Sequence, residues 1–251
     1  MKWGAPVVKK APDEWTERQF CSRRGISDMC CRYYMEESPE LRPFVEAARR
    51  SSILPGMVEK LARSLVTEGE VRPTDIVPVL ARNRHDQDAV YPMIWGFTRE
   101  NASALFNARS ETAHQKPSFK DCWARRRCIV PASWYYEWEH LTDQSGKKKT
   151  GDRYLIQPKD SRLTLLAGLY RIEADGFPHF VVLTREPSEA IAFIHDRMPV
   201  ILPETSAGKW IHDMPEKGWT ESHALTDMIY EKNSAGEAAR TSCLWYGTGS
   251  R

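Results

Sequence analysis

Short apolar runs of strand length, separated by turn residues, place the tightest constraint on how this 251-residue chain can fold. Residues 163–172 and 179–184 are apolar or alternate between apolar and polar, and the turn pair Asp175-Gly176 lies between them. This is the pattern of neighbouring β-strands. Comparable strand-like runs occur at 76–80, 91–97, 128–138, 154–157 and 198–202.

Helical patterns occur among these strands without a regular strand–helix–strand alternation. In residues 39–50, Ser38 can cap a helix, Pro39 fits its first position, and apolar residues share one face. Further helices are expected at 116–126, 186–194, 204–212 and 221–232. This arrangement predicts an α+β fold: a single domain with a mixed or antiparallel β core and peripheral helices.

The two ends of the chain differ from this domain, which we place at residues 29–233. Residues 1–28 lack an apolar period and the positive, apolar, small-residue order of a signal peptide. We expect them to be a non-native or cleaved N-terminal extension, either translated from a wrongly chosen start or removed after synthesis. Residues 234–251 are expected to form a flexible tail.

Composition narrows the class of protein without identifying a function. With 41% hydrophobic and 28% charged residues, and no apolar run of transmembrane length, the chain is typical of soluble globular proteins. The net charge of +2 does not by itself imply nucleic acid, and the basic clusters at 125–127 and 147–149 are expected to be solvated surface. The six cysteines show no paired Cys-x-x-Cys spacing, so we expect no zinc site and reduced thiols in a cytoplasm.

The run Met29-Cys30-Cys31-Arg32-Tyr33 becomes reactive if the working chain begins at Met29. Removal of an initiator Met before Cys30 would leave an amine and a thiol on neighbouring carbons. The α-amine has a pKa of about 7.7–8.0, against about 10.4 for lysine, so more of it is unprotonated near neutrality. It can condense with an aldehyde, and the sulfur can then close a ring. The ordinary alternative is a buried pair of small hydrophobic residues.

Four segments place reactive polar residues at the ends of apolar strands. They are Cys30-Cys31-Arg32-Tyr33, Asn107-Ala108-Arg109-Ser110-Glu111-Thr112, Pro131-Ala132-Ser133-Trp134-Tyr135-Tyr136-Glu137-Trp138 and Ile194-His195-Asp196-Arg197-Met198-Pro199. Together with Trp95-Gly96-Phe97, they resemble, in order and spacing, the motifs of the SOS response-associated peptidase (SRAP) family. That family contains the abasic-site processing proteins that crosslink to DNA. The resemblance runs from Met29 to roughly Ile211.

Three features depart from the family pattern, and one of them is the C-terminal tail after Asp213, which lacks a recognisable family ending. Cys31 stands where the usual Met-Cys-Gly-Arg opening has Gly. Residues 98–106 are short and lack the Trp-containing loop that helps relatives to wedge open DNA strands, so the resemblance does not extend to strand separation.

The resemblance implies a catalytic group of Cys30, Asn107, Glu137 and His195. The residue types fit acid–base chemistry, because a partly desolvated Glu has a raised pKa and a His titrates near neutral pH. An Asn offers both a donor and an acceptor. The ordinary alternatives are an outward Glu on an alternating strand, a capping or core His, and a turn Asn.

The resemblance also implies DNA contacts from Arg32, Arg109, Trp138 and Arg197. Guanidinium groups bind phosphates bidentately, and a tryptophan face can stack on a base. The alternatives are ion pairs with Glu111 or Asp196 within the protein, and core packing of the tryptophan.

The implied function is an abasic-site sensor that links Cys30 to the ring-opened aldehyde of an abasic site in single-stranded DNA, through a thiazolidine. Self-processing peptidase activity and lyase activity on abasic sites would accompany it. We expect a cytoplasmic monomer that uses no metal or cofactor and binds no membrane. Two alternatives remain: a cysteine peptidase acting in trans, and a non-catalytic module that binds single-stranded nucleic acid.

Overall fold

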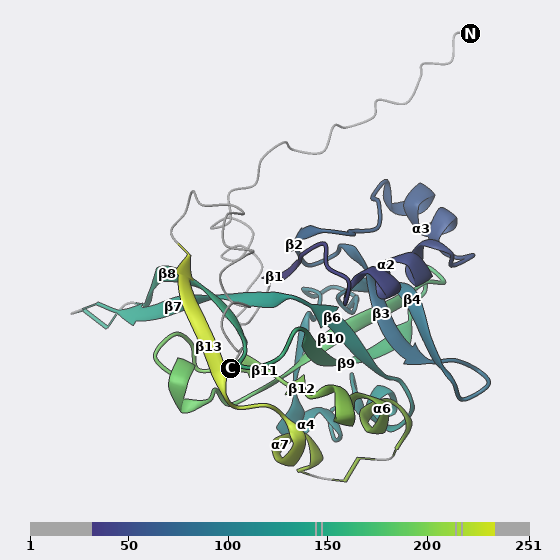
Figure 1. The fold of residues 1–251 in the computed structure, drawn as a ribbon. Coiled ribbons are helices and arrows are strands. Elements are labelled where there is room, and N and C mark those ends of the chain that lie inside the picture. Colours follow the sequence, from purple (N-terminus) through teal and green to yellow (C-terminus); the bar gives the residue numbers. More distant parts are fainter. Residues whose placement is uncertain (1–31, 144, 147, 214, 217, 234–251) are drawn as a thin grey trace, which may run out of the picture.

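The computed structural model describes residues 32–143, 145–146, 148–213, 215–216 and 218–233. They form an α+β fold of two β-sheets with short helices at the edges (Figure 1), which confirms the predicted fold class. The predicted extension at 1–28, Cys30 and the predicted tail at 234–251 lie outside the described residues. No helix in the described part of the chain is long and apolar enough to span a membrane.

The smaller sheet has five strands, joined by antiparallel pairs in the order β13-β8-β7-β1-β2. They are β1 (Arg32–Met35), β2 (Gly69–Val71), β7 (Trp134–Thr142), β8 (Lys148–Pro158) and β13 (Met228–Asn233). Side chains alternate between the two faces of a strand. Tyr33 and Tyr135 are therefore fully buried on the core face, while Tyr34 and Trp134 lie half-buried on the opposite face.

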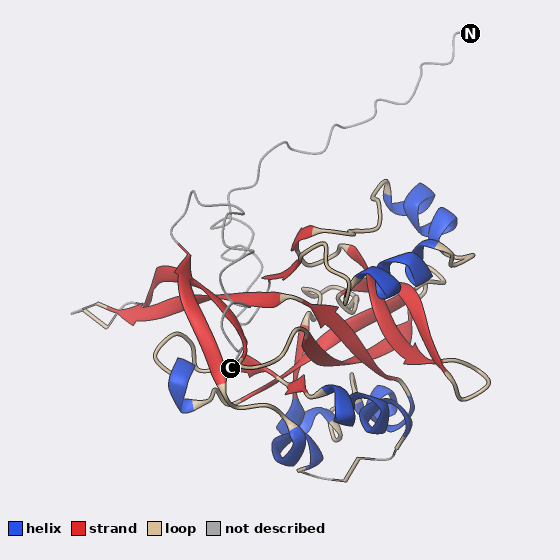
Figure 2. Ribbon diagram, viewed as in Figure 1, coloured by secondary structure: helices blue, strands red, loops and turns tan. Residues whose placement is uncertain are grey.

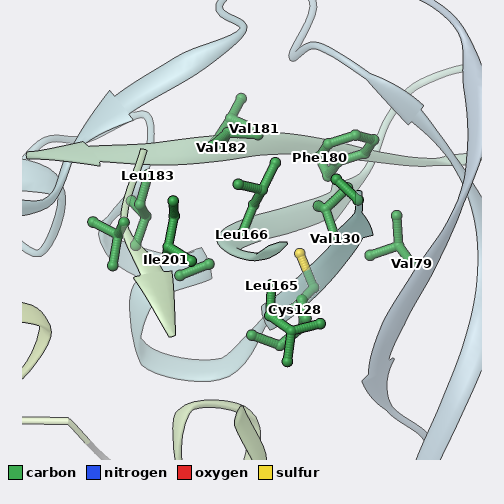
Figure 3. Close-up of a cluster of buried hydrophobic side chains, with 14 of the residues drawn as sticks. Val79, Cys128, Val130, Leu165, Leu166, Phe180, Val181, Val182, Leu183 and Ile201 are labelled. Atoms are coloured by element: carbon green, nitrogen blue, oxygen red, sulfur yellow. The ribbon is translucent and has the colours of Figure 1, made fainter. Parts of the chain in front are cut away.

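The larger sheet has eight strands. They are β3 (Ile76–Arg82), β4 (Asp88–Trp95), β5 (Asn107–Arg109), β6 (Arg127–Ala132), β9 (Thr164–Ile172), β10 (Pro178–Arg185), β11 (Met198–Pro199) and β12 (Ile201–Leu202). Strands β3, β4, β10, β9 and β6 pair in a closed ring, in which the β4–β10 pair is parallel. Apolar side chains from the ring pack together, among them Val79, Val130 and Phe180 (Figure 3).

Short helices lie around the sheets (Figure 2). They are α2 (Arg42–Arg49), α3 (Leu54–Leu61), α4 (Ser110–Ala113), α5 (Lys120–Arg125), the 3-10 helix η1 (Glu189–Ile191), α6 (Glu204–His212) and α7 (Trp219–His223). Helix α2 packs on β3 and β4 and buries Val45 and Ala48. The helix predicted at 39–50 is thus present but starts later, and Ser38 Oγ accepts a hydrogen bond from the Leu41 N–H in the turn before it.

The C-terminal helix predicted at 221–232 is wrong over most of its length. Helix α7 ends at His223, and residues 228–233 form strand β13 on the edge of the smaller sheet. Met228 is buried and Tyr230 is exposed, and every residue from 228 to 233 is paired with β8. Pairing with a strand distant in sequence therefore overrides the local helical preference.

The basic cluster at 125–127 was expected to be solvated surface. Arg125 and Arg126 are exposed, but Arg127 is buried, so the expectation is wrong for this residue. Arg127 is 2% exposed, and its guanidinium donates to the carbonyls of Trp123 at 2.6 Å, Trp210 at 2.5 Å, Ile211 at 3.3 Å and Asp213. Burial lowers the pKa of Arg127 to about 10, which leaves it charged at neutral pH. The Arg127 guanidinium therefore donates to carbonyl groups at the C-terminal ends of α5 and α6. These carbonyls have no hydrogen-bond partner within their own helices.

Replacement of Arg127 by Met should lower the free energy of unfolding by about 2–4 kcal/mol, because buried carbonyls lose charged donors. Urea denaturation followed by circular dichroism measures the change. The neighbouring exposed residue provides a matched control: Arg126→Met should change stability by less than about 0.5 kcal/mol. Equal effects of the two substitutions would contradict this role of Arg127.

Candidate active site

The side chains of Glu137 and His195 meet inside the protein. Glu137, on β7, is 5% exposed, and His195, in the loop after η1, is 3% exposed. Oε1 of Glu137 lies 3.4 Å from Nε2 of His195. The outward-facing alternative for Glu137 is therefore wrong, and two of the predicted catalytic residues form a pair close enough to exchange a proton.

A bulge in β7 brings a third side chain to this pair. Glu137 and His140 are three residues apart, so a regular strand would point them to opposite faces. The pairing of β7 with β8 shifts register between Trp138 and His140, and such a bulge re-aims the residues around it. The ring centroids of His140 and His195 lie 3.9 Å apart. The backbone N–H of His140 donates to the Ile194 carbonyl at 2.9 Å. The loop that carries His195 is thereby fixed to β7.

Backbone hydrogen bonding sets the tautomer of His195. The N–H of Arg197 donates to Nδ1 of His195 at 2.9 Å. In the neutral ring Nδ1 is then the acceptor, and Nε2, which faces Glu137, carries the proton. Oδ1 of Asp196 lies 3.0 Å from Nδ1, and the Asp196 side chain is 77% exposed. Asp196 can therefore accept a hydrogen bond from Nδ1 when the ring is doubly protonated.

Arg197 is held by an ion pair with Glu111, one of the two intramolecular partners that were the alternative to a DNA contact. Its Nη1 and Nη2 donate to the two carboxylate oxygens of Glu111 at 2.7 and 2.8 Å, and Nη2 also donates to the Thr184 carbonyl at 2.8 Å. Burial favours the neutral form of Glu111, but the hydrogen bonds from Arg197 outweigh it, so the pKa of Glu111 lies below its ordinary value. This bidentate pair fixes the segment that contains His195 against α4.

Asn107 and Arg109 lie at the two ends of the short strand β5. This strand runs parallel to β10, with Asn107 opposite Val182 and Arg109 opposite Thr184. Asn107 is half-buried, and Arg109 is exposed. Since Arg197 donates to the Thr184 carbonyl, both predicted arginines lie at the same end of β10.

The predicted DNA-binding residues Arg32 and Trp138 lie on the other face of β7 from Glu137. Arg32 is opposite Tyr136 in the β1–β7 pair, and Trp138 is two residues further along β7. Arg32 is 6% exposed, and its Nε lies 3.1 Å from Oε1 of Glu70. Its ion-pair partner is thus Glu70, not Glu111 or Asp196. Trp138 is half-buried.

Two cysteines fall in the described part of the chain, Cys122 and Cys128, and both are buried free thiols. Burial raises the pKa of both thiols, and the pKa of Cys128 lies well above its ordinary value. A thiol is nucleophilic as its thiolate, so neither is suited to attack a substrate. Cys30 lies outside the described residues, two positions before the start of β1.

One group of side chains in the described ranges could hold a metal ion. It consists of His140, His195 and Asp196, which each offer one donor atom, all within 4.8 Å of one another. Imidazole nitrogens and a carboxylate oxygen are typical ligands of zinc and related ions. A bound ion would occupy one of the two ring nitrogens of His195.

Three residues beside the candidate site were not predicted from the sequence. His140 reaches His195 through a bulge that no motif marks. Glu70 and Arg153 are far from Arg32 along the chain and meet it through strand pairing, with Nη1 of Arg153 3.1 Å from Oε2 of Glu70. Their positions follow from the bulge and from the order of the strands in the sheet, which no local pattern in the sequence reveals.

Comparisons with known proteins support the family resemblance. The model of the family described as SOS response associated peptidase (SRAP) matches residues 29–240. The abasic site processing protein YoqW of Bacillus subtilis is 36% identical over 122 residues, which cover 47% of this chain and 52% of the relative. The abasic site processing protein YedK of Escherichia coli is 26% identical over 184 residues, covering 67% and 78%. The chain spans about half the length of the first of these curated relatives.

Solved structures share the fold. A protein from Bacteroides thetaiotaomicron superimposes with a TM-score of 0.61 at 22% identity, covering 82% of this chain and 93% of the other. A phage-related protein from Bordetella bronchiseptica gives a TM-score of 0.58 at 24% identity, covering 81% and 94%. At these identities the likeness concerns the fold alone. With the family model matching most of its length, the chain belongs to the SOS response associated peptidase (SRAP) family.

Proposed function

We propose that this protein recognises abasic sites in single-stranded DNA and becomes covalently linked to them through Cys30. The observation that carries the proposal is the buried Glu137–His195 pair, with 3.4 Å between Oε1 and Nε2. It occurs in a chain whose family relatives are named abasic site processing proteins. The substrate, the strand state and the chemistry below are parts of this proposal.

The reaction joins the 1,2-aminothiol of Cys30 to an aldehyde. The amine nitrogen attacks the aldehyde carbon of the ring-opened sugar, and the carbonyl oxygen leaves as water, so that a Schiff base forms. The thiol sulfur then adds to the imine carbon while its proton passes to the nitrogen, which closes a thiazolidine ring. The amine must be free for the first step, so the proposal requires Cys30 to be the first residue of the active protein.

Glu137 and His195 move the protons of these steps. His195 carries its proton on Nε2, toward Glu137, because the Arg197 N–H holds Nδ1. It can give that proton to the sugar oxygen as the ring opens, and the Glu137 carboxylate can take the proton that the amine loses. Asn107 is proposed to orient the amine and to hydrogen-bond the sugar through its amide.

The proposed DNA contacts divide by exposure. Arg109 is exposed at the end of β5 and is free to approach a phosphate. Arg197 is bound to Glu111 and the Thr184 carbonyl, which favours a positioning role beside His195 alongside any phosphate contact. Arg32 and Trp138 are proposed to contact DNA on the face of β7 opposite Glu137. The guanidinium would bind a phosphate, and the indole would stack on a base.

Two side activities follow from the same site. Removal of residues 1–29 by the protein itself would expose Cys30, in line with the family's peptidase description. The Schiff base could also undergo β-elimination, which would cleave the DNA strand. The alternative of a peptidase that uses an internal thiolate gains no support from Cys122 or Cys128, because both are buried with raised pKa values.

The variant Cys30→Ser should lose the stable crosslink but keep a Schiff base, because the free amine survives while the sulfur is lost. Borohydride should trap that intermediate on an abasic oligonucleotide, as seen on a denaturing gel. Cys31→Ala is the matched control and should crosslink normally. A heat-stable adduct of Cys30→Ser without reductant would rule out the thiazolidine.

Glu137→Gln should slow crosslinking by about 10²–10⁴-fold, the usual contribution of a general acid–base group. The amide keeps the shape of the carboxylate but cannot exchange the proton, so affinity for DNA should stay nearly unchanged. Single-turnover rates at saturating abasic DNA measure the effect. Glu139→Gln, two residues along the same strand, should react at the parent rate. A parent rate for Glu137→Gln itself would remove Glu137 from the mechanism.

A further inference from the structure

An aromatic face with an arginine cluster lies on the smaller sheet, on the opposite side of β7 from Glu137 (β7 is labelled in Figure 1). Tyr34 stacks on Trp134 with ring centroids 4.6 Å apart and planes 3° apart, and Tyr136 meets Tyr34 edge-on at 6.4 Å. Trp138 continues the row along β7. Apart from Tyr136 these rings are half-buried, so each keeps some surface for a ligand.

Three arginines converge on one carboxylate at this face. The Nε atoms of Arg32 and Arg72 lie 3.1 and 3.2 Å from Oε1 of Glu70, and Nη1 of Arg153 lies 3.1 Å from Oε2. Asp75 also interacts electrostatically with Arg32 and Arg72 and lies 3.8 Å from Nη1 of Arg63, so four arginines share two carboxylates here. A carboxylate that receives three guanidinium groups occupies the kind of position that suits a phosphate, since both groups accept charge-assisted hydrogen bonds from arginine.

Arg153 is held in place by rings as well as by charge. Its Cζ lies 3.8 Å from the ring centroid of Tyr136 and 5.7 Å from that of Trp138. Stacking of this kind orients the planar fork and reduces the freedom that it loses on binding a phosphate. The Arg153 side chain is 25% exposed, so an approaching phosphate can reach it.

Acidic residues limit the cluster on one side. Glu36 and Glu68 lie near enough to Tyr34 to help raise its pKa, after burial and Tyr136. By contrast Glu139 and Asp152 surround Tyr154, which pairs with Glu137 on the other face of the sheet. The surplus of positive charge is therefore at the end of the face formed by Arg153, Tyr136 and Trp138.

We propose that Arg153 and Trp138 bind one nucleotide of single-stranded DNA, the guanidinium its phosphate and the indole its base, and that Glu70 is the internal competitor which the phosphate displaces. The inference rests on the proposed function, because it takes single-stranded DNA as the ligand. It adds Arg153 as a phosphate ligand, and Glu70 as its competitor, to the face on which Arg32 and Trp138 are already proposed to contact DNA. The arginines around Glu70, which outnumber the carboxylates Glu70 and Asp75, lie beside rings that can stack on bases and favour this occupant over an apolar peptide.

The experiment measures binding of the full-length protein to a fluorescent, undamaged single strand by anisotropy over a range of salt concentrations. This strand has no aldehyde, so crosslinking cannot contribute. Arg153→Ala should weaken binding by about three- to tenfold and lower the slope of log Kd against log salt by about 0.7, the value for one phosphate on a single strand. Glu70→Gln should act in the opposite direction: tighter binding and a steeper slope.

Matched controls separate this effect from a general change of charge. Glu40 pairs with Arg162 at 3.0 Å elsewhere on the surface, so Glu40→Gln and Arg162→Ala repeat the two charge changes away from the cluster. They should leave affinity and slope within about twofold of the parent. If Glu70→Gln does not fold, Arg72→Ala, at a side chain 58% exposed, replaces it and should weaken binding with a smaller slope.

The outcomes are distinct from those that test Cys30. Glu70→Gln that binds more weakly, or Arg153→Ala that binds like Arg162→Ala, would overturn the proposal and leave this face to another occupant, such as a segment of this chain or a second copy. Either result is independent of whether Cys30 crosslinks to abasic DNA.

Discussion

The pairing of β10 with four other strands decides where the candidate site lies. It pairs with β4 and β9 in the closed ring, and it also pairs with β5 and β11. Strand β5 brings Asn107 and Arg109 to it, and β11 begins directly after the His195-Asp196-Arg197 segment. Arg197 returns to β10 through the Thr184 carbonyl. Segments far apart in sequence are thus brought together by backbone hydrogen bonds of a buried strand, which gives the polar residues a rigid support.

Strand β7 then separates two kinds of environment by the alternation of its side chains. Glu137 points inward to His195, where burial removes water from the pair. Tyr136 and Trp138 point to the other face, where they meet Arg153. Acid–base groups gain from such desolvation, whereas phosphate-binding groups need exposure to meet a long polyanion. A single strand with a bulge after Trp138 provides both environments within a few residues.

Local patterns predicted much of this fold, and long-range pairing decided the rest. The apolar runs at 163–172 and 179–184 became β9 and β10 with bounds shifted by a residue or so. Residues 221–232 were expected to be helical, because nothing local reveals that β8 offers a free edge to 228–233. The family resemblance put Glu137 and His195 in one catalytic group, whereas local sequence alone favoured an outward Glu. The burial of Arg127 and the three arginines around Glu70 depend on partners far along the chain.

The central claim is that the reacting group is the terminal aminothiol of Cys30. Peptide mapping by mass spectrometry after reaction with an abasic single strand tests it most directly. The account predicts one modified peptide, which begins at Cys30 and carries the sugar remnant with the loss of one water, because an imine that closes to a thiazolidine releases one water in all. A sugar remnant on an internal lysine, or on a peptide that still contains Met29, would contradict the account.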